Sequence, residues 1–277
     1  MTAVTEHEKD LERIANFSMM DDDFFTACLD KDKECTGLVL NIILGRSDLT
    51  VVETKAQYFI KNLQGRSVRL DVFARDSQGK EYNIEMQQAN SGAVPRRARY
   101  NSSLMDANIS EPGEYYDQLL DTYVIFITAN DVLHGNKPIY HIERHIEEQG
   151  VRFDDGSHIL YVNATMQDET PLGKLMFDLH CTDPNQMHYP ALATKSRYFK
   201  EDQEGVRKMC KAMEEMREEA AKKGRAEGIT IGEAQATEKV ARSMLEKHFS
   251  LDVIAELTGL QIAEIQRLIK PGMMHNV

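Results

Sequence analysis

Two runs of alternating apolar and polar residues, joined by a short polar segment, form the clearest pattern in the chain. Residues 69–75 and 82–87 place apolar side chains at every second position, which is the period of a β-strand. The connection contains Gly79, and a three-residue loop over residues 77–79 puts this glycine where a positive φ is needed. The pattern therefore predicts a β-hairpin.

This loop pairs Asp76 with Lys80 and so sets the register of both strands. One face of the hairpin is then wholly apolar, and its facing pairs are Leu70 with Met86, Val72 with Ile84, and Ala74 with Tyr82. A slip of one residue would mix apolar with charged side chains, and burial of one face resists such a slip. The register is therefore a specific expectation.

The second face of the predicted hairpin carries the candidate chemistry. Its facing pairs are Asp71 with Glu85, Arg69 with Gln87, and Phe73 with Asn83. Two carboxylates directly opposite each other repel. A divalent cation is the simplest group that compensates, because hard cations take carboxylate oxygens as ligands.

Periodic patterns elsewhere predict a mixed sheet flanked by helices. Apolar residues at helical spacing predict helices over residues 24–29, 36–44 and 96–109. Strands are predicted over residues 51–60, 122–128, 138–146 and 158–163, and turns over residues 62–65 and 111–113. Asp21, Asp22 and Asp23 precede the first helix, where capping is the expected role and metal binding the alternative.

The composition changes after residue 200. Residues 201–239 are rich in Glu, Lys, Met and Ala and predict a helical linker, flexible or poorly packed where Gly224, Gly228 and Gly232 recur. Residues 240–277 predict a small helical unit similar to a helix-turn-helix. A packing or dimerisation module is one interpretation of this unit, and sequence-specific DNA binding is the other. We thus expect an N-terminal arm at residues 1–20 and a core at residues 21–200.

Composition limits the classes of function. The chain has 277 residues, 42% of them hydrophobic, which suffices for a large domain with appendages. Its net charge of −12 does not suggest a general nucleic-acid-coating protein but leaves a local basic patch open. Four cysteines without a CxxC pair indicate neither a zinc knuckle nor a disulfide framework. The chain also lacks the features of a signal peptide and any apolar run of membrane-spanning length, so we expect a cytoplasmic protein without a membrane partner.

The hairpin also matches an active-site layout in which an acid ends one strand and an acid-x-lysine follows on the next, that of the PD-(D/E)XK nuclease superfamily. Residues 69–72 and 82–87, with Gly79, Arg96 and Tyr100, resemble the PD-(D/E)XK family of transposases and recombination-promoting nucleases, the Rpn family. The resemblance continues in residues 123–127, 140–144, 170–176 and 197–200, and so covers most of residues 20–220.

This resemblance implies an α/β fold: a restriction-endonuclease-like core with a mixed β-sheet flanked by helices, plus a C-terminal helical extension. It also implies a divalent-metal-dependent DNA endonuclease associated with mobile elements or recombination. Asp71, Glu85 and the backbone carbonyl of Met86 would hold Mg²⁺ or Mn²⁺, and Gln87 would orient the attacking water as the third catalytic residue. A further acid is expected from Glu53 or residues 21–23.

Two positions depart from the superfamily pattern. Leu70 stands in place of the proline before the first acid, which changes strand geometry little. Gln87 stands in place of lysine and offers an amide without charge, so the metal must carry more of the electrostatic stabilisation. Arg69, opposite Gln87, is a candidate source of the missing charge, and structural neutralisation of the two acids is the alternative role for it.

Arginines and one tyrosine near the hairpin are candidate contacts to DNA. Arg96 and Arg97 begin a predicted helix, Tyr100 lies on the Arg96 face at i,i+4, and Arg69 lies on the hairpin. Phosphate contact is the functional interpretation of the arginines, and solubility or helix packing the alternative. Cutting both strands often needs two active sites, which leaves a homodimer open. A catalytically degenerate nuclease fold that serves as a DNA- or protein-binding module remains the alternative function.

Overall fold

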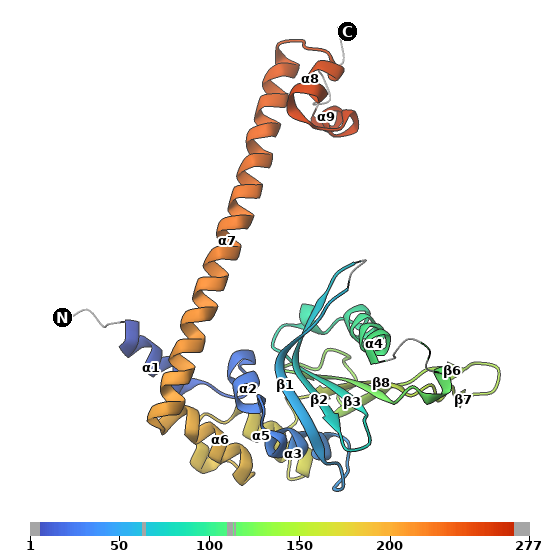
Figure 1. The fold of residues 1–277 in the computed structure, drawn as a ribbon, viewed down its shortest axis with the longest axis vertical. Coiled ribbons are helices and arrows are strands. Elements are labelled where there is room, and N and C mark those ends of the chain that lie inside the picture. Colours follow the sequence, from blue (N-terminus) through green and yellow to red (C-terminus); the bar gives the residue numbers. More distant parts are fainter. Residues whose placement is uncertain (1–5, 63–64, 110–112, 114, 269–277) are drawn as a thin grey trace. The chain divides into compact units, whose positions relative to one another are not determined.

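The computed structural model describes residues 6–268, except residues 63–64, 110–112 and 114. The chain forms two compact units, of which the first ends at Cys210 and the second begins at Lys211. The first unit is a mixed β-sheet with α4 on one face and α2, α3 and α5 on the other (Figure 1). This arrangement confirms the predicted α/β class.

Within the described residues, six strands form the main sheet in the order β1-β2-β3-β4-β8-β5. Their bounds are β1 Val51–Ile60, β2 Val68–Asp76, β3 Glu81–Gln87, β4 Thr122–Thr128, β5 Ile139–Ile142 and β8 Ser157–Asn163. Strands β3, β4 and β8 run parallel, and β1, β2 and β5 join them in antiparallel pairs.

The segment predicted as one strand over residues 138–146 is two short strands. β5 pairs with β8 in the main sheet, whereas β6, His145–Ile146, pairs with β7, Val151–Arg152. The two halves of the segment have different partners, so the chain leaves the sheet between them. The single-strand prediction was therefore wrong.

Helices make up most of the remaining described chain. Their bounds are α1 Glu6–Asn16, α2 Asp22–Leu29, α3 Lys33–Ile43, α4 Pro95–Ile109, α5 Pro171–His180, α6 Pro190–Glu201, α7 Gln203–Glu246, α8 Leu251–Thr258 and α9 Ile262–Leu268. Helices α5 and α6 were not predicted from the sequence, although each begins with proline, which favours the first turn of a helix. The predicted turns at residues 62–65 and 111–113 lie partly outside the described residues.

The hairpin of β2 and β3 has the predicted register. Ladder pairs join Val72 to Ile84, Phe73 to Asn83 and Ala74 to Tyr82. At the closure, the Asp76 N–H donates to the Lys80 carbonyl at 3.0 Å, and Gly79 has φ of +86°. The local pattern alone was sufficient here, because loop geometry and strand alternation impose the same pairing.

The alternation predicted for Leu70 does not hold. Leu70 joins the core cluster that contains Phe73, although the simple pleat assigns these two side chains to opposite faces. On the neighbouring strand β1, Gln57 has φ of +51° between the residues paired with Val72 and Leu70. Tyr58, the partner of Leu70, stacks on Phe73 with 4.6 Å between ring centroids. Leu70 and Phe73 therefore pack into the same core cluster on either side of Asp71 in the sequence.

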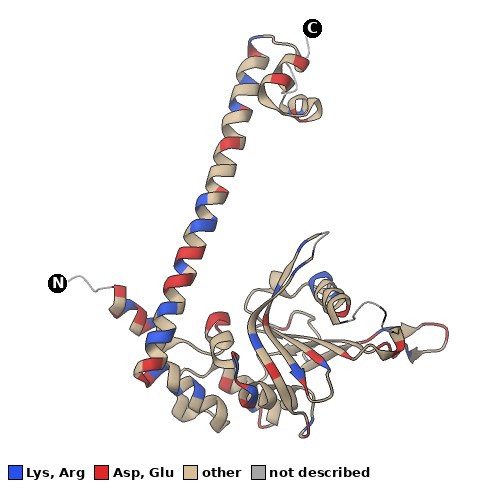
Figure 2. Cartoon of the chain, in the orientation of Figure 1, with Lys and Arg blue, Asp and Glu red and all other residues tan. Residues whose placement is uncertain are grey.

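The second unit contains the end of α7 with α8 and α9. Ala241, Ile254 and Ile265 form its fully buried centre. Gly259, at φ of +73°, ends α8 in the left-handed conformation. The start of the small helical unit predicted over residues 240–277 is the last part of α7, which runs for 44 residues through the glycine repeat and ends at Glu246. Acidic and basic side chains alternate along α7 (Figure 2).

Candidate active site

Two acids lie on adjacent strands where β2 and β3 separate. Asp71 on β2 is 7% exposed, and Glu85 on β3 is fully buried. The β2–β3 ladder ends at the pair of Val72 and Ile84. Beyond it, the Met86 N–H donates to Oδ2 of Asp71 at 3.0 Å. The carboxylate of Asp71 therefore takes the place of a backbone acceptor at the point where the strands separate.

The electrostatics of this acid pair are unfavourable without a cation. Burial and the neighbouring charge of Glu85 raise the pKa of Asp71 to about 8. Burial also raises the pKa of Glu85, against the opposing effect of Arg97. Asp71 therefore favours the protonated form near neutral pH, because its charged form is desolvated and lies beside the charge of Glu85.

The Glu85 carboxylate is enclosed by hydrogen-bond donors. Its Oε1 accepts from Nδ2 of Asn83 at 3.0 Å and from Nδ2 of Asn101 at 3.4 Å. Its Oε2 accepts from Nη2 of Arg97 at 2.5 Å and from Nε2 of Gln87 at 3.4 Å. Such donors favour an ionised carboxylate.

Asn83 and Asn101 were not predicted from the sequence to be part of the site. Asn83 lies two residues before Glu85 and shares its strand face, and Asn101 follows Arg97 by one helical turn. This spacing was the available signal. Both asparagines are buried, which a polar position in a strand or helix does not reveal without the tertiary structure.

Arg97 contacts Glu85 rather than facing solvent alone. Its Nη1 donates to Oε1 of Gln87 at 3.1 Å and to the Gly92 carbonyl at 3.0 Å. Its guanidinium also lies 5.8 Å from the ring centroid of Phe126. Arg97 hydrogen-bonds to Glu85 and Gln87 and so places a positive charge beside them, a role that the sequence suggested for Arg69.

The other candidate DNA contacts lie in different surroundings. Arg69 is exposed on β2 and acts electrostatically on Asp22 and Asp23 in the first turn of α2. Arg96 is exposed near the start of α4. The Tyr100 hydroxyl donates to the Arg66 carbonyl and accepts from Asn62 at 3.1 Å, so Tyr100 ties α4 to the β1–β2 connection.

Among the candidate acids outside the hairpin, Asp22 is the one whose charge acts on Asp71 and Glu85. Its charge raises the pKa of both Asp71 and Glu85. Glu53, the other sequence candidate, instead pairs with Lys55 at 2.5 Å and with Arg75 at 3.2 Å. The tertiary structure thus distinguishes two acids that sequence spacing could not.

The acid pair carries the ligand types that a hard divalent cation prefers. Asp71 and Glu85 carry carboxylate oxygens. The Met86 peptide group faces β2, because its N–H donates to Asp71. The Gln87 carbonyl faces the other way and accepts from the Ala129 N–H. Among the described residues no group of three or more His, Cys, Asp or Glu is placed to hold a metal. Two acids with a backbone carbonyl suit Mg²⁺, which usually keeps several waters.

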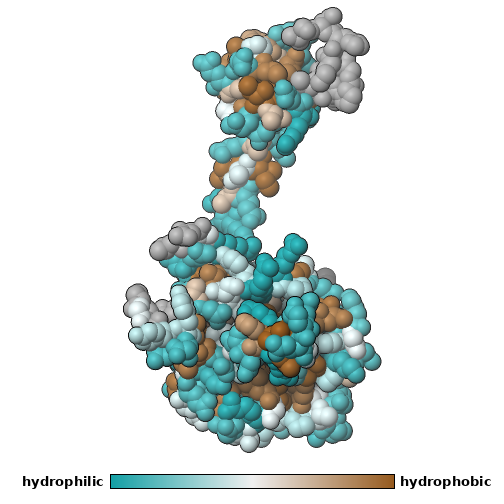
Figure 3. All heavy atoms as spheres, turned by 90° about the vertical axis from the view of Figure 1, so that its right-hand side faces the viewer, coloured by the Kyte–Doolittle hydropathy of each residue, from teal (hydrophilic) through white to brown (hydrophobic). Residues whose placement is uncertain are grey.

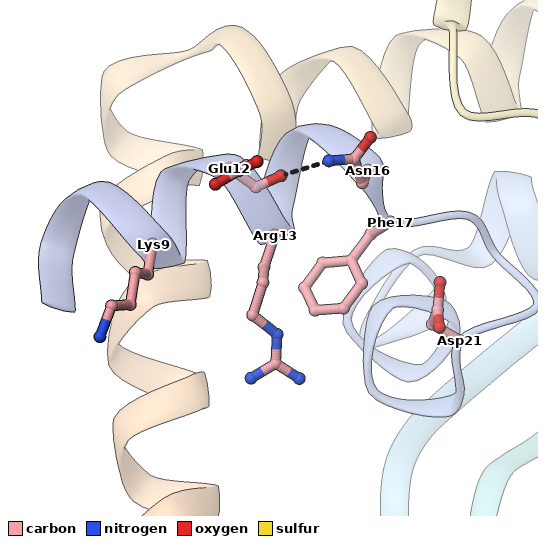
Figure 4. A pocket seen from close by; sticks show the side chains of 6 residues that line it. All are labelled: Lys9, Glu12, Arg13, Asn16, Phe17 and Asp21. Atoms are coloured by element: carbon pink, nitrogen blue, oxygen red, sulfur yellow. Dashed lines mark hydrogen bonds between the residues drawn. The ribbon is translucent and has the colours of Figure 1, made fainter. Parts of the chain in front are cut away.

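A surface hollow of about 440 Å³ lies between α1 and the start of α2 (Figure 4). Its lining residues are Lys9, Glu12, Arg13, Asn16, Phe17 and Asp21. Asp21 is hydrogen-bonded to Gln88, directly after β3, at 3.4 Å. The hollow therefore lies beside the end of the site strand, but neither Asp71 nor Glu85 lines it.

A mixed sheet flanked by helices, with paired acids on adjacent strands, defines an α/β protein of the PD-(D/E)XK type. A model of the PD-(D/E)XK nuclease family transposase matches residues 28–227, so the chain belongs to this family. Comparisons with curated proteins and with solved structures gave no significant match. In the described part of the chain, no helix is long and apolar enough to cross a membrane.

Proposed function

We propose that this protein is a divalent-metal-dependent endonuclease that hydrolyses DNA phosphodiester bonds and is associated with mobile elements or DNA recombination. Membership of the family supports a nuclease or transposase-associated role. The observation that carries the proposal is the buried pair of Asp71 and Glu85, whose raised pKa values indicate a site in need of a cation.

Each residue of the site has a role in this proposal. Asp71, Glu85 and the Met86 carbonyl hold Mg²⁺ or Mn²⁺, which supplies a polarised phosphate oxygen and an activated water when bound. Gln87 orients the attacking water. Asp22 adds negative charge beside the pair and is the candidate for a further acidic ligand.

Substrate contacts in this proposal are local. The net charge of −12 opposes general binding to a polyanion. Arg69 and Arg96 are exposed and contact phosphates, whereas Arg97 and Tyr100 serve mainly through their contacts within the protein.

We further propose a nuclease core at residues 21–200 and a cytoplasmic location. We also propose a homodimer that cuts both strands. Light scattering with and without DNA measures the oligomeric state that this requires.

A plasmid-cleavage assay with Mg²⁺ or Mn²⁺ tests the proposal. Asp71→Asn and Glu85→Gln keep the shape of each side chain but remove its charge, and we expect each to lower the nicking rate by about 10²-fold or more. Asp22→Asn should also lower the rate, whereas Glu53→Gln should leave it within about threefold, because Glu53 binds Lys55 and Arg75 instead.

Two outcomes would contradict the proposal. Equal nicking by the unmodified protein, Asp71→Asn and Glu85→Gln would show that the activity comes from elsewhere. No cleavage together with no Mn²⁺ binding, measured by calorimetry, would favour the alternative of a degenerate nuclease fold that acts as a binding module.

A further inference from the structure

The Gln87 side chain is enclosed on three sides. Its Oε1 accepts from Nη1 of Arg97 at 3.1 Å, and its Nε2 donates to Oε2 of Glu85 at 3.4 Å. The third side is the backbone of Gly92, where an added Cβ would overlap Oε1 of Gln87 and lie 3.0 Å from its Cδ. The amide of Gln87 therefore has one defined orientation.

Arg97 is held by the same set of contacts. One Nη atom reaches Glu85 at 2.5 Å, and the other reaches both Gln87 and the Gly92 carbonyl. The Arg97 side chain is 37% exposed, while that of Glu85 is 0% exposed. A fixed guanidinium fork of this kind is preorganised to orient neighbouring groups.

We propose that Arg97 is the positioning residue of the site: it orients the amide of Gln87 and places a positive charge beside Glu85 and Gln87 that glutamine itself does not carry. This inference rests on the proposed nuclease function. Because Arg97 occupies Oε1 of Gln87, the amide presents its NH₂ group as a donor to water or phosphate oxygen.

This role differs from direct DNA contact, the functional interpretation of Arg97 from the sequence. A phosphate-contacting arginine contributes to substrate binding, so its loss raises KM and lowers the salt dependence of binding. A positioning residue acts on the reacting groups, so its loss lowers kcat with little change in KM.

The decisive variants are Arg97→Gln, Gln87→Lys and the double variant. A lysine at position 87 brings its own charge next to Glu85, so it should replace what Arg97 supplies. We expect Arg97→Gln to lower kcat at least tenfold with KM within threefold, and the double variant to recover to within about threefold of Gln87→Lys alone.

Arg75→Gln is the matched control. Arg75 also pairs with a buried glutamate of the same hairpin, with Nη2 2.6 Å from Oε1 of Glu81, but at the opposite end of the strands. We expect Arg75→Gln to leave kcat and KM unchanged. Gln87→Lys should change kcat and KM equally in the unmodified protein and in Arg75→Gln.

Melting in EDTA supplies a readout that does not depend on activity. Both Arg97→Gln and Arg75→Gln leave a buried carboxylate without its cation, so both should lower the melting temperature by several degrees. Gln87→Lys should restore the melting temperature of Arg97→Gln but not that of Arg75→Gln, because only Glu85 lies within reach of position 87.

Failure of the inference is distinct from failure of the proposed function. If the unmodified protein cleaves DNA in an Asp71-dependent way but Gln87→Lys rescues neither kcat nor melting of Arg97→Gln, the inference is overturned alone. A rise of KM without loss of kcat in Arg97→Gln overturns it in favour of phosphate contact. If the unmodified protein does not cleave, the proposed function falls, and the positioning role falls with it.

Discussion

Asp71 shows how a single buried carboxyl group can oppose the stability of the protein that contains it. The group is 7% exposed and lies close enough to Glu85 for their charges to interact. Its one hydrogen bond from the Met86 N–H favours the ionised form but does not outweigh burial. A buried acid of this kind reduces stability near neutral pH, which is the expected cost where a protein keeps a functional site.

The pH dependence of folding measures this effect. The pKa of Asp71 rises from 3.8 to about 8 in the folded protein, so between these values the folded state holds a proton that the unfolded chain has released. The stability contributed by this group is therefore complete below about pH 4 and is lost as the pH rises through 8. Asp71→Asn should remove this decline, worth up to about 1.4 kcal/mol per pH unit.

Urea denaturation in EDTA between about pH 5 and pH 8 provides the measurement. Asp117→Asn is the control, because Asp117 is exposed on the surface. The difference in slope between the unmodified protein and Asp71→Asn reports the contribution of Asp71 together with its electrostatic coupling to Glu85. An unchanged slope in Asp71→Asn would contradict the prediction.

At the scale of the element, α7 shows that glycines in one helix can have opposite roles. Gly205, in its first turn, packs directly on the backbone of α6, and an added Cβ would overlap the Tyr198 carbonyl oxygen and lie 2.7 Å from the Tyr198 carbonyl carbon. Gly224 has no atom within 4 Å of such a Cβ. The first glycine permits a close approach, whereas the second only weakens the helix.

Alanine substitution should therefore have opposite effects at these two positions. Gly205→Ala should lower the free energy of unfolding by about 2 kcal/mol or more, because backbone cannot move aside as a flexible side chain can. Gly224→Ala should raise local helix stability by about 0.5–1 kcal/mol, since alanine loses less conformational entropy. Urea denaturation followed by circular dichroism measures both, and destabilisation of equal size by both substitutions would reject the distinction.

At the scale of the whole molecule, the chain combines a nuclease-family core with a separate small helical unit. The second unit buries Ile254 completely but leaves Phe249, Leu257 and Ile262 exposed by 47%, 69% and 42%. Figure 3 shows apolar side chains on its surface. A DNA-binding helix needs basic side chains. Arg267 is the basic residue of α9 as described, and the next basic residue, Lys270, lies outside the described residues. This composition favours a packing or protein-contact role for the unit over sequence-specific DNA binding.

Selective unfolding of the second unit tests its independence. Ile254→Ala removes buried apolar volume and should lower the free energy of unfolding of that unit by about 2–4 kcal/mol. Val253→Ala is the control, because the neighbouring Val253 is 36% exposed. We expect calorimetry to show a lowered transition for the second unit with the transition of the first unit unchanged. Plasmid cleavage and gel-shift affinity should then match those of Val253→Ala, and weakened DNA binding would support the DNA-binding interpretation.

Local patterns in the sequence were sufficient for the site hairpin, its register and the helix that follows it. Alternation with period two, a loop that needs Gly79 at positive φ, and a helical pattern over residues 96–109 each depend on neighbouring residues alone. The sequence by itself therefore placed Asp71 and Glu85 on adjacent strands and indicated the family. The sequence missed α5 and α6, which form largely through packing on the core.

Only the tertiary structure decided which groups surround the acid pair. The sequence register placed Arg69 opposite Gln87, but the hydrogen bonds to Gln87 and Glu85 come from Arg97 on a different element. Likewise, Asp22 rather than Glu53 acts on the pair. The physical reason is that the period of one strand determines its faces, whereas contacts between elements depend on how helices pack across the sheet.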